Sequence, residues 1–399
     1  MSRREPLVLL LCFLVASLEG FDIQAFGITA PRLIVEFHLG PAWIGAAGSA
    51  AMIGMVGGAA AGGWLAQRWS LKFALIASTL LFAGFSLLTA FAQTPTELIA
   101  ARLFTGLGFG GAMPNLLAVA TRLRPGGRHA GAATLIFCGM PVGGALVAAC
   151  AGWLGDPLPW RTLYLIGGGA PLVVAAALAI WLPAFPPAAG KQGGDDRLHR
   201  VLLGPDYGLT TLALWLAFIA ALLLLYLLLN WLPLLVIGKG FTPAFGSRAA
   251  LFFNASGIVG ALVAGRWADR VGYRTPVWVA TLLLVSGLVV MSAAHDGTVL
   301  LVAACLLGAA TVSAQYLLYA AAPLPYPAGQ SIVAAGVAIG VGRLGSIAGP
   351  LLAGATRSAG VPIDTLLIGL VPVALVVGAG MIIALRRAGA MKGGQSDAS

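Results

Sequence analysis

Long apolar stretches alternate with short polar ones along the whole 399-residue chain. Crossing the hydrocarbon core of a bilayer takes a helix of about 20 residues, and twelve stretches are long enough. Because backbone polar groups in hydrocarbon must be satisfied within their own segment, and the short alternating strands of a barrel are absent from the pattern, we predict helices. The twelve predicted spans cover residues 7–30, 41–66, 73–92, 97–121, 130–153, 161–183, 209–236, 244–266, 275–294, 298–321, 328–355 and 361–385.

Composition agrees with a chain that lies in a membrane. Hydrophobic residues make up 59% of the sequence and charged residues only 9%, whereas soluble domains carry about 25% charged residues. We therefore predict an all-α membrane protein with twelve transmembrane helices in two six-helix bundles.

A polar segment rich in Gly, Pro and charge divides the spans six and six. It predicts an N-terminal bundle over residues 1–183, a cytoplasmic linker over 184–206, a C-terminal bundle over 207–387 and a cytoplasmic tail over 388–399. The halves are related, because a shift of 202 residues lays GWLAQR at 63–68 over GRWADR at 265–270. A repeat of this kind is typical of secondary transporters.

The cations indicate how the chain is oriented. An even number of spans leaves both termini on one side, and an excess of Lys and Arg marks the cytoplasmic side. Of the 23 Lys and Arg residues, two lie inside the membrane and sixteen on the side of the termini, so both termini are predicted to be cytoplasmic in a cell inner membrane. The five on the opposite side are Arg32, Arg161, Lys239, Arg248 and Arg357.

Two carboxylates, Glu19 and Asp22, lie inside the first predicted span, whereas the other acids lie in loops and at ends. A charged acid at bilayer depth costs about 2.5 to 3.5 kcal/mol on insertion scales, so such residues usually mark a proton or ion pathway. Being three residues apart, they share one helix face, and we expect the pair to hold a proton near neutral pH. The alternative is that either acid only pairs with an arginine and locks helices together.

Two arginines also lie within predicted spans. At 1.5 Å of rise per residue, Arg102 and Asp22 both fall in the outer half of the membrane and can pair. Arg343 falls near the midplane, where a permanently charged guanidinium needs an anion such as a substrate carboxylate held by two hydrogen bonds. For both arginines the alternative is a structural role. Under the 202-residue shift, Glu19, Asp22 and Arg102 meet Ala221, Leu224 and Ala304, so the repeated scaffold does not demand these charges.

Amide and phenol side chains in the fourth, seventh and tenth spans complete a candidate substrate pocket. Such groups can bind a ring hydroxyl while aromatic faces stack on the ring. Each of them taken alone can equally serve helix packing. The candidates are Asn115, Asn230, Tyr226, Gln315, Tyr316 and Tyr319.

Other classes of function lack support in the sequence. A Gly-rich phosphate loop, a zinc-ligand spacing and a nucleophile triad are all absent from it, so we expect neither an enzyme nor a bound cofactor or metal. The net charge of +10 follows the membrane topology, so we expect no nucleic-acid partner. The intramembrane acids favour a proton-coupled transporter, and a non-transporting membrane receptor or structural protein is the alternative from another class.

Several segments resemble a known family. GRWADRVGYR at 265–274 resembles the loop signature of the major facilitator superfamily, and the twelve-span plan fits it. Five further segments are similar to the aromatic acid:proton symporter family, above all to its hydroxyphenylpropionate transporter branch. They are EGFD at 19–22, GLGFGGAMPN at 106–115, NWLPLL at 230–235, LYAAAP at 318–323 and GRLG at 342–345.

The resemblance implies a monomeric symporter that imports a small aromatic carboxylate, such as a hydroxyphenylpropionate or hydroxybenzoate, together with protons. A drug or metabolite exporter of the same superfamily is the alternative. The resemblance places Glu19, Asp22 and Arg102 in proton coupling and Arg343 in substrate binding. It also implies a conformational role for the loop residues Gly265, Asp269, Arg270, Gly272 and Arg274. The first-half loop departs from the signature, with Gln67, Ser70 and Leu71 where the family has Asp, Gly and Arg.

Overall fold

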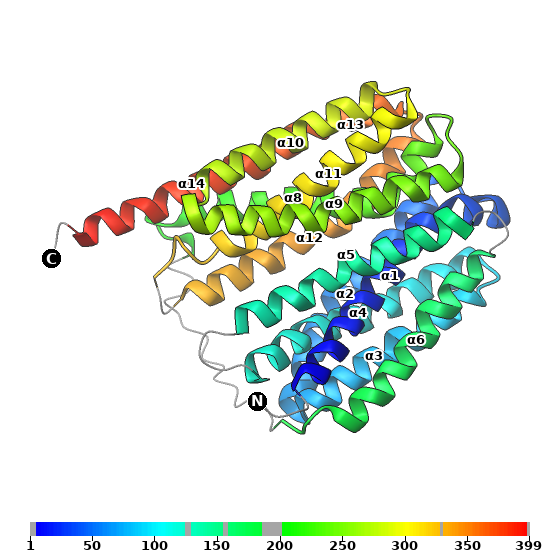
Figure 1. The fold of residues 1–399 in the computed structure, drawn as a ribbon, viewed down its shortest axis with the longest axis horizontal. Coiled ribbons are helices and arrows are strands. Elements are labelled where there is room, and N and C mark those ends of the chain that lie inside the picture. Colours follow the sequence, from blue (N-terminus) through cyan, green and yellow to red (C-terminus); the bar gives the residue numbers. More distant parts are fainter. Residues whose placement is uncertain (1–4, 124–128, 155–158, 186–201, 328–329, 397–399) are drawn as a thin grey trace. The chain divides into compact units, whose positions relative to one another are not determined.

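The structure is a computed structural model that describes residues 5–123, 129–154, 159–185, 202–327 and 330–396. Its helices in the first half are α1 (Glu5–Phe37), α2 (Pro41–Arg68), α3 (Leu71–Ala90), α4 (Pro95–Leu123), α5 (His129–Leu154) and α6 (Trp160–Trp181). In the second half they are α8 (Gly208–Ile237), α9 (Pro243–Val271), α10 (Arg274–Ala293), α11 (Gly297–Ala321), α12 (Ser331–Ser358), α13 (Ile363–Gly369) and α14 (Val371–Ser396) (Figure 1).

The predicted all-α membrane architecture is confirmed. Within the described ranges, twelve helical segments are long and apolar enough to cross a bilayer. Several helices extend beyond the predicted spans, and α1 has 33 residues because its polar ends continue the helix past the apolar run. The predicted last span, 361–385, corresponds to the membrane-spanning segment Ile363–Arg387, in which α13 and α14 meet at Leu370.

The predicted segments outside the bundles are only partly described. Residues 186–201 of the predicted linker lie outside the described residues, as do the predicted cytoplasmic cations Arg3, Arg4, Arg124 and Arg128. The predicted tail at 388–399 continues α14 as helix up to Ser396.

Asp296 and Gly272 mark two helix ends in the second half of the chain. The side chain of Asp296 accepts hydrogen bonds from the backbone N–H groups of Thr298 and Val299 at 2.8 and 3.1 Å, which caps the start of α11. Gly272 follows α9 with φ of +83°, a conformation that residues with a Cβ rarely adopt. This conformation accounts for the glycine between α9 and α10 in the loop that resembles the superfamily signature.

Two compact units divide the chain. The first contains residues 1–191 together with 229–251, and the second contains 192–228 together with 252–399. The end of α8 and the start of α9 therefore belong to the first unit, although both fall in the second half of the sequence. The predicted boundary between two bundles at the linker stays a prediction.

Glycines let helices of the first unit approach to backbone contact. α2 packs along α4 and α1 along α5 (Figure 1). A Cβ at Gly106 of α4 would lie 1.9 Å from the carbonyl oxygen of Ala51, and one at Gly143 of α5 would lie 1.7 Å from that of Ser17. Only glycine fits at such contacts, which are typical of helix interfaces in membranes.

The second unit repeats these contacts at positions 202 residues later. A Cβ at Gly308 of α11 would lie 1.9 Å from the carbonyl oxygen of Phe253, and one at Gly345 of α12 would lie 1.9 Å from that of Ile219. These positions correspond to the contacts of Gly106 and Gly143 in the first unit. The internal repeat seen in the sequence therefore extends to the packing of the helices.

We expect Gly106→Ala to lower the free energy of unfolding by about 1 to 3 kcal/mol, because the added methyl group overlaps the backbone of α2. The matched control is Gly84→Ala in α3, where a Cβ would meet nothing within 4 Å. There the change should stabilise the helix by up to about 1 kcal/mol. Thermal unfolding of both variants in the same detergent measures the difference, and equal midpoints would contradict the packing argument.

Candidate functional site

A buried cluster of polar side chains joins three helices of the first unit. Arg102 of α4 donates a hydrogen bond from Nη1 to Oδ1 of Asp22 of α1, and the hydroxyl of Ser86 of α3 donates to Oδ2. The predicted pairing of Asp22 with Arg102 is therefore confirmed. Asp22 and Ser86 are 0% exposed and Arg102 is 1% exposed, so the ion pair is shielded from water.

Aromatic residues enclose the cluster on its side toward the end of α1. The guanidinium carbon of Arg102 lies 5.3 Å from the centre of the Phe26 ring, within the range of a cation–π contact. Two turns beyond Asp22 on α1, the hydroxyl of Thr29 lies 3.2 Å from that of Tyr164 of α6. The surroundings are thus largely apolar, and such surroundings strengthen the attraction between the two charges.

Glu19 lies one turn before Asp22 and is 1% exposed. Gly20, the residue after Glu19, holds α1 against α5, since a Cβ there would lie 2.0 Å from the carbonyl oxygen of Met140. Both carboxylates predicted to couple protons are therefore buried in the first unit.

The equivalent positions of the second unit carry no charge. Ala221, Leu224 and Ala304 correspond to Glu19, Asp22 and Arg102 under the 202-residue shift, and all three are buried and apolar. The repeated helix contacts thus form in the second unit without charges at these three positions. The charges of the first unit are an addition to the shared scaffold.

Arg343 of α12 lies beside Tyr226 of α8 in the second unit. Its Nη1 donates a hydrogen bond to the phenol oxygen at 3.3 Å, and Tyr226 is buried while Arg343 is half-buried. The two residues come together because α12 packs closely on α8 at Gly342, Gly345 and Gly349. The structure therefore joins two of the predicted substrate-binding residues.

The three predicted residues of α11 do not share one face. A Cβ at Gly265 of α9 would lie 3.0 Å from the ring of Tyr316, so Tyr316 packs toward α9. The ring of Tyr319 lies 5.5 Å from that of Phe218 of α8 in an edge-to-face arrangement. Gln315 is four residues before Tyr319 and lies on the same face. Within α11, Tyr316 is thus set apart from the other two candidates.

The two predicted asparagines belong to the first unit. The amide nitrogen of Asn115 donates to the carbonyl oxygens of Gly111 at 2.7 Å and Gly62 at 3.3 Å, which ties α4 to α2. Asn230 is buried in α8, and a Cβ at Gly27 of α1 would lie 2.6 Å from its carbonyl oxygen. Both asparagines therefore lie at tight helix contacts.

The residues of the predicted conformational loop span the junction of α9 and α10: Gly265, Asp269 and Arg270 belong to the end of α9, Gly272 lies between the helices and Arg274 begins α10. Asp269, Arg270 and Arg274 are exposed, and Gly272 provides the turn. Burial raises the pKa of the neighbouring Tyr273, and the negative charge of Asp269 raises it further. The charges of the loop are thus presented at the surface of the second unit.

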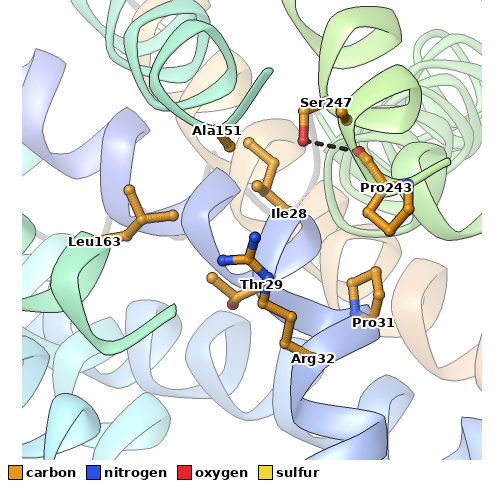
Figure 2. Close-up of a pocket in the computed structure, with 9 residues that line it drawn as sticks. Ile28, Thr29, Pro31, Arg32, Ala151, Leu163, Pro243 and Ser247 are labelled. Atoms are coloured by element: carbon orange, nitrogen blue, oxygen red, sulfur yellow. Dashed lines mark hydrogen bonds between the residues drawn. The ribbon is translucent and has the colours of Figure 1, made fainter. Parts of the chain in front are cut away.

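A small pocket lies at the end of α1 in the first unit. Figure 2 shows Thr29 and Arg32 of α1 on one side and Pro243 and Ser247 of α9 on the other, with Leu163 of α6 nearby. The predicted binding residues are not among those that line it. Glu19 and Asp22 do not line this pocket and lie nearer the start of α1.

Sequence reasoning missed Ser86, Tyr164 and Thr311 as candidate functional residues. Ser86 and Thr311 lie in spans that carry other hydroxyl residues, and serine and threonine commonly satisfy their own helix backbone. A sequence pattern alone therefore gives no signal that separates them from the other hydroxyl groups of the chain.

Comparison with known proteins finds relatives over nearly the whole chain. Residues 12–350 match the family model described as Major Facilitator Superfamily. The chain is 37% identical to the 3-(3-hydroxy-phenyl)propionate transporter of Escherichia coli (strain K12), covering 97% of this chain and 95% of that one. It is 30% identical to a 4-hydroxybenzoate transporter of Pseudomonas putida, covering 88% and 85%. A solved D-xylose-proton symporter shares the fold, with a TM-score of 0.76 at 16% identity over 95% and 96% of the chains.

We expect Arg102→Gln to lower the free energy of unfolding by about 3 to 5 kcal/mol, because Asp22 would keep a buried charge without its cation. The double variant Asp22→Asn, Arg102→Gln removes both charges and should recover most of that loss. The control is Arg161→Gln, which breaks the exposed 2.6 Å pair with Glu36 and should cost about 0 to 1 kcal/mol. Thermal unfolding in detergent tests this order of stabilities, and a single Arg102 variant as stable as the control would contradict it.

Proposed function

The chain belongs to the major facilitator superfamily, and from this premise we propose that it imports a small aromatic carboxylate together with protons. Members of this superfamily are membrane transporters and not enzymes. The two relatives transport a hydroxylated phenylpropionate and a hydroxybenzoate. We propose a substrate of the same chemical class, taken up by alternating access.

The observation that carries the proposal is the buried Asp22 and Arg102 pair, which the second unit replaces by apolar residues. A charge pair of this kind inside a membrane usually serves transport rather than packing. Protonation of Asp22 removes its negative charge and weakens its attraction to Arg102. The bound proton thereby changes the contacts that join α1 to α4. Glu19, one turn away, shares the proton with Asp22.

We propose Arg343 as the group that binds the substrate carboxylate. A guanidinium presents two parallel N–H groups to a carboxylate, and Tyr226 orients it from the neighbouring helix. Gln315 and Tyr319 lie on one face of α11 and supply an amide and an aromatic ring for the substrate. Asn115, Asn230 and Tyr316 remain candidates, and their observed contacts give them a role in positioning helices.

The placement in the cell follows from the distribution of charge. We propose a monomer in the cell inner membrane with both termini cytoplasmic, since sixteen cations lie on the predicted side of the termini. On this topology the loop between α9 and α10 is cytoplasmic. Asp269, Arg270 and Arg274 can there form contacts that differ between the conformations of the transport cycle. In the altered loop with Gln67, Ser70 and Leu71, Arg68 and Lys72 match the two arginines, but the negative charge of Asp269 is replaced by Gln67.

Asp22→Asn should abolish accumulation of substrate against a gradient, because the amide keeps the shape of the side chain but cannot release a proton. Uptake of a radiolabelled aromatic acid into proteoliposomes, with and without an inward proton gradient, measures this. The control is Asp296→Asn, which also removes one carboxylate but keeps a side chain able to cap α11. Accumulation by the Asp22 variant at the wild-type level would contradict the proposed coupling.

Arg343→Gln should weaken the apparent affinity for the acid about 10- to 150-fold, since a hydrogen bond to a charged group contributes about 1.5 to 3 kcal/mol. Arg343→Lys should recover only part of this, because an ammonium lacks the planar fork.

The control for Arg343 is the uncharged amide of the same substrate. Its competition with uptake should be weak in the wild type and nearly unaffected by the substitution. An equal loss for acid and amide would assign Arg343 to the fold, and the carboxylate site would then be sought at Arg102.

A further inference from the structure

One face of α11 carries three polar or aromatic residues at a spacing of four, Thr311, Gln315 and Tyr319. The neighbouring face packs on α9, because a Cβ at Gly257 would lie 2.7 Å from the side chain of Val312 and one at Gly265 would lie 3.0 Å from the ring of Tyr316. Thr311, Gln315 and Tyr319 form a stripe beside this contact, starting one turn after Gly308, which itself lies against Phe253 of α9. We refer to Thr311, Gln315 and Tyr319 as the α11 stripe.

Two members of the α11 stripe are buried without satisfying their polar groups. Gln315 is 7% exposed and Thr311 is 3% exposed. Within the described part of the chain, neither the amide atoms of Gln315 nor the hydroxyl of Thr311 has a hydrogen-bond partner. Each such group costs about 1 to 3 kcal/mol of stability. Two of them one turn apart therefore need a reason other than folding.

The hydrogen bonding of Thr311 differs from that of several other buried threonines. The hydroxyls of Thr105 and Thr281 each donate to the carbonyl oxygen four residues earlier, that of Ala101 and Val277, at 2.8 Å. This bond is the usual way for a threonine to satisfy its hydroxyl within a helix. Thr311 makes no such bond, so its hydroxyl is left available on the same face as the amide of Gln315.

The α11 stripe lies close to the segment that carries Arg343. The ring of Tyr319 contacts Phe218 of α8, and a Cβ at Gly342 of α12 would lie 2.8 Å from Cβ of Phe218. Phe218 therefore lies between the stripe and the residue that precedes Arg343.

The stripe also extends to the depth of the Arg343 guanidinium. Three chain reversals separate α8 from α11, so the two helices run in opposite directions. Thr311 lies two turns from Tyr319, and Tyr226, the partner of Arg343, lies two turns from Phe218. Since both helices rise by the same amount per residue, Thr311 lies at a depth similar to that of Tyr226.

We infer that Thr311 and Gln315 form a subsite for a hydroxyl group on the aromatic ring of the substrate, and that this subsite selects hydroxylated acids over unsubstituted ones. The inference rests on the proposed import of aromatic carboxylates with Arg343 at the carboxylate. A phenol hydroxyl donates one hydrogen bond and accepts others, which suits an amide oxygen, an amide nitrogen and a threonine hydroxyl. A site whose buried polar groups need a substrate hydroxyl rejects the analogue that lacks it.

The test compares uptake of 3-(3-hydroxyphenyl)propionate and 3-phenylpropionate by the full chain in proteoliposomes. Thr311→Val and Gln315→Met keep the size of each side chain and remove its hydrogen-bonding groups. Each variant should raise KM for the hydroxylated acid about 5- to 100-fold, with KM for the unsubstituted acid unchanged or lower. The preference of the wild type for the hydroxylated acid should thereby be lost.

The matched control is Thr281→Val in α10. Its hydroxyl is also buried but is satisfied by its own helix, so the variant should keep the wild-type preference. Thermal unfolding without substrate provides a second readout that does not depend on transport. Thr311→Val should unfold at the wild-type temperature or above it. The substitution removes a buried hydroxyl that has no hydrogen-bond partner among the described residues.

The outcomes separate this inference from the proposed function. A wild type that takes up both acids equally well, or Thr311 and Gln315 variants that lose both acids by the same factor, would overturn the subsite alone. A Thr311→Val variant that unfolds well below the wild type would assign the hydroxyl to the fold and also overturn it. A wild type that takes up neither acid would overturn the proposed function and the subsite with it.

Discussion

The free-energy cost of burying polar groups inside a membrane is the constraint on which the rest of this structure depends. The hydrocarbon of lipid cannot hydrogen-bond a carboxylate or a guanidinium, so such a group needs an oppositely charged or polar partner within the protein. Asp22 and Arg102 meet this demand together with Ser86, and they thereby join α1, α3 and α4. Any event that changes the charge of Asp22, such as the binding of a proton, must change the contacts among three helices at once.

The helices around this cluster are held by backbone contact at glycines, and that scaffold is the same in both halves of the sequence. Gly106 and Gly143 in the first unit correspond to Gly308 and Gly345 in the second, and each lies against the backbone of a neighbouring helix. A shared scaffold makes the differences between the units informative. The first unit adds acids and an arginine, and the second adds Arg343 with its own set of polar side chains.

This division suits a proton-coupled transporter. In our proposal the first unit binds the proton and the second recognises the substrate, Arg343 at the carboxylate and the α11 stripe at the ring. Separate sites allow each part of the substrate to be tested by its own substitution. They also explain why the second unit tolerates buried polar groups that contribute nothing to its stability, since their partners would be supplied by the substrate.

The sequence by itself determined the twelve spans and the class of the protein, because a bilayer requires a long apolar helix for each crossing. It also singled out Glu19, Asp22, Arg102 and Arg343, since a charge inside such a span is costly and therefore stands out. The proposed roles of these residues remain predictions. The repeat of 202 residues was equally visible, and the structure shows that it governs helix packing.

Only the tertiary structure decided which side chains meet. A helical sequence gives the spacing of side chains on a face but not the helix that this face contacts. For this reason the sequence treated Tyr316 and Tyr319 alike, although one packs on α9 and the other on α8. Likewise it could not show that Ser86 reaches Asp22, or that the hydroxyl of Thr311 has no hydrogen-bond partner among the described residues, because both depend on the neighbours that folding brings to each polar group.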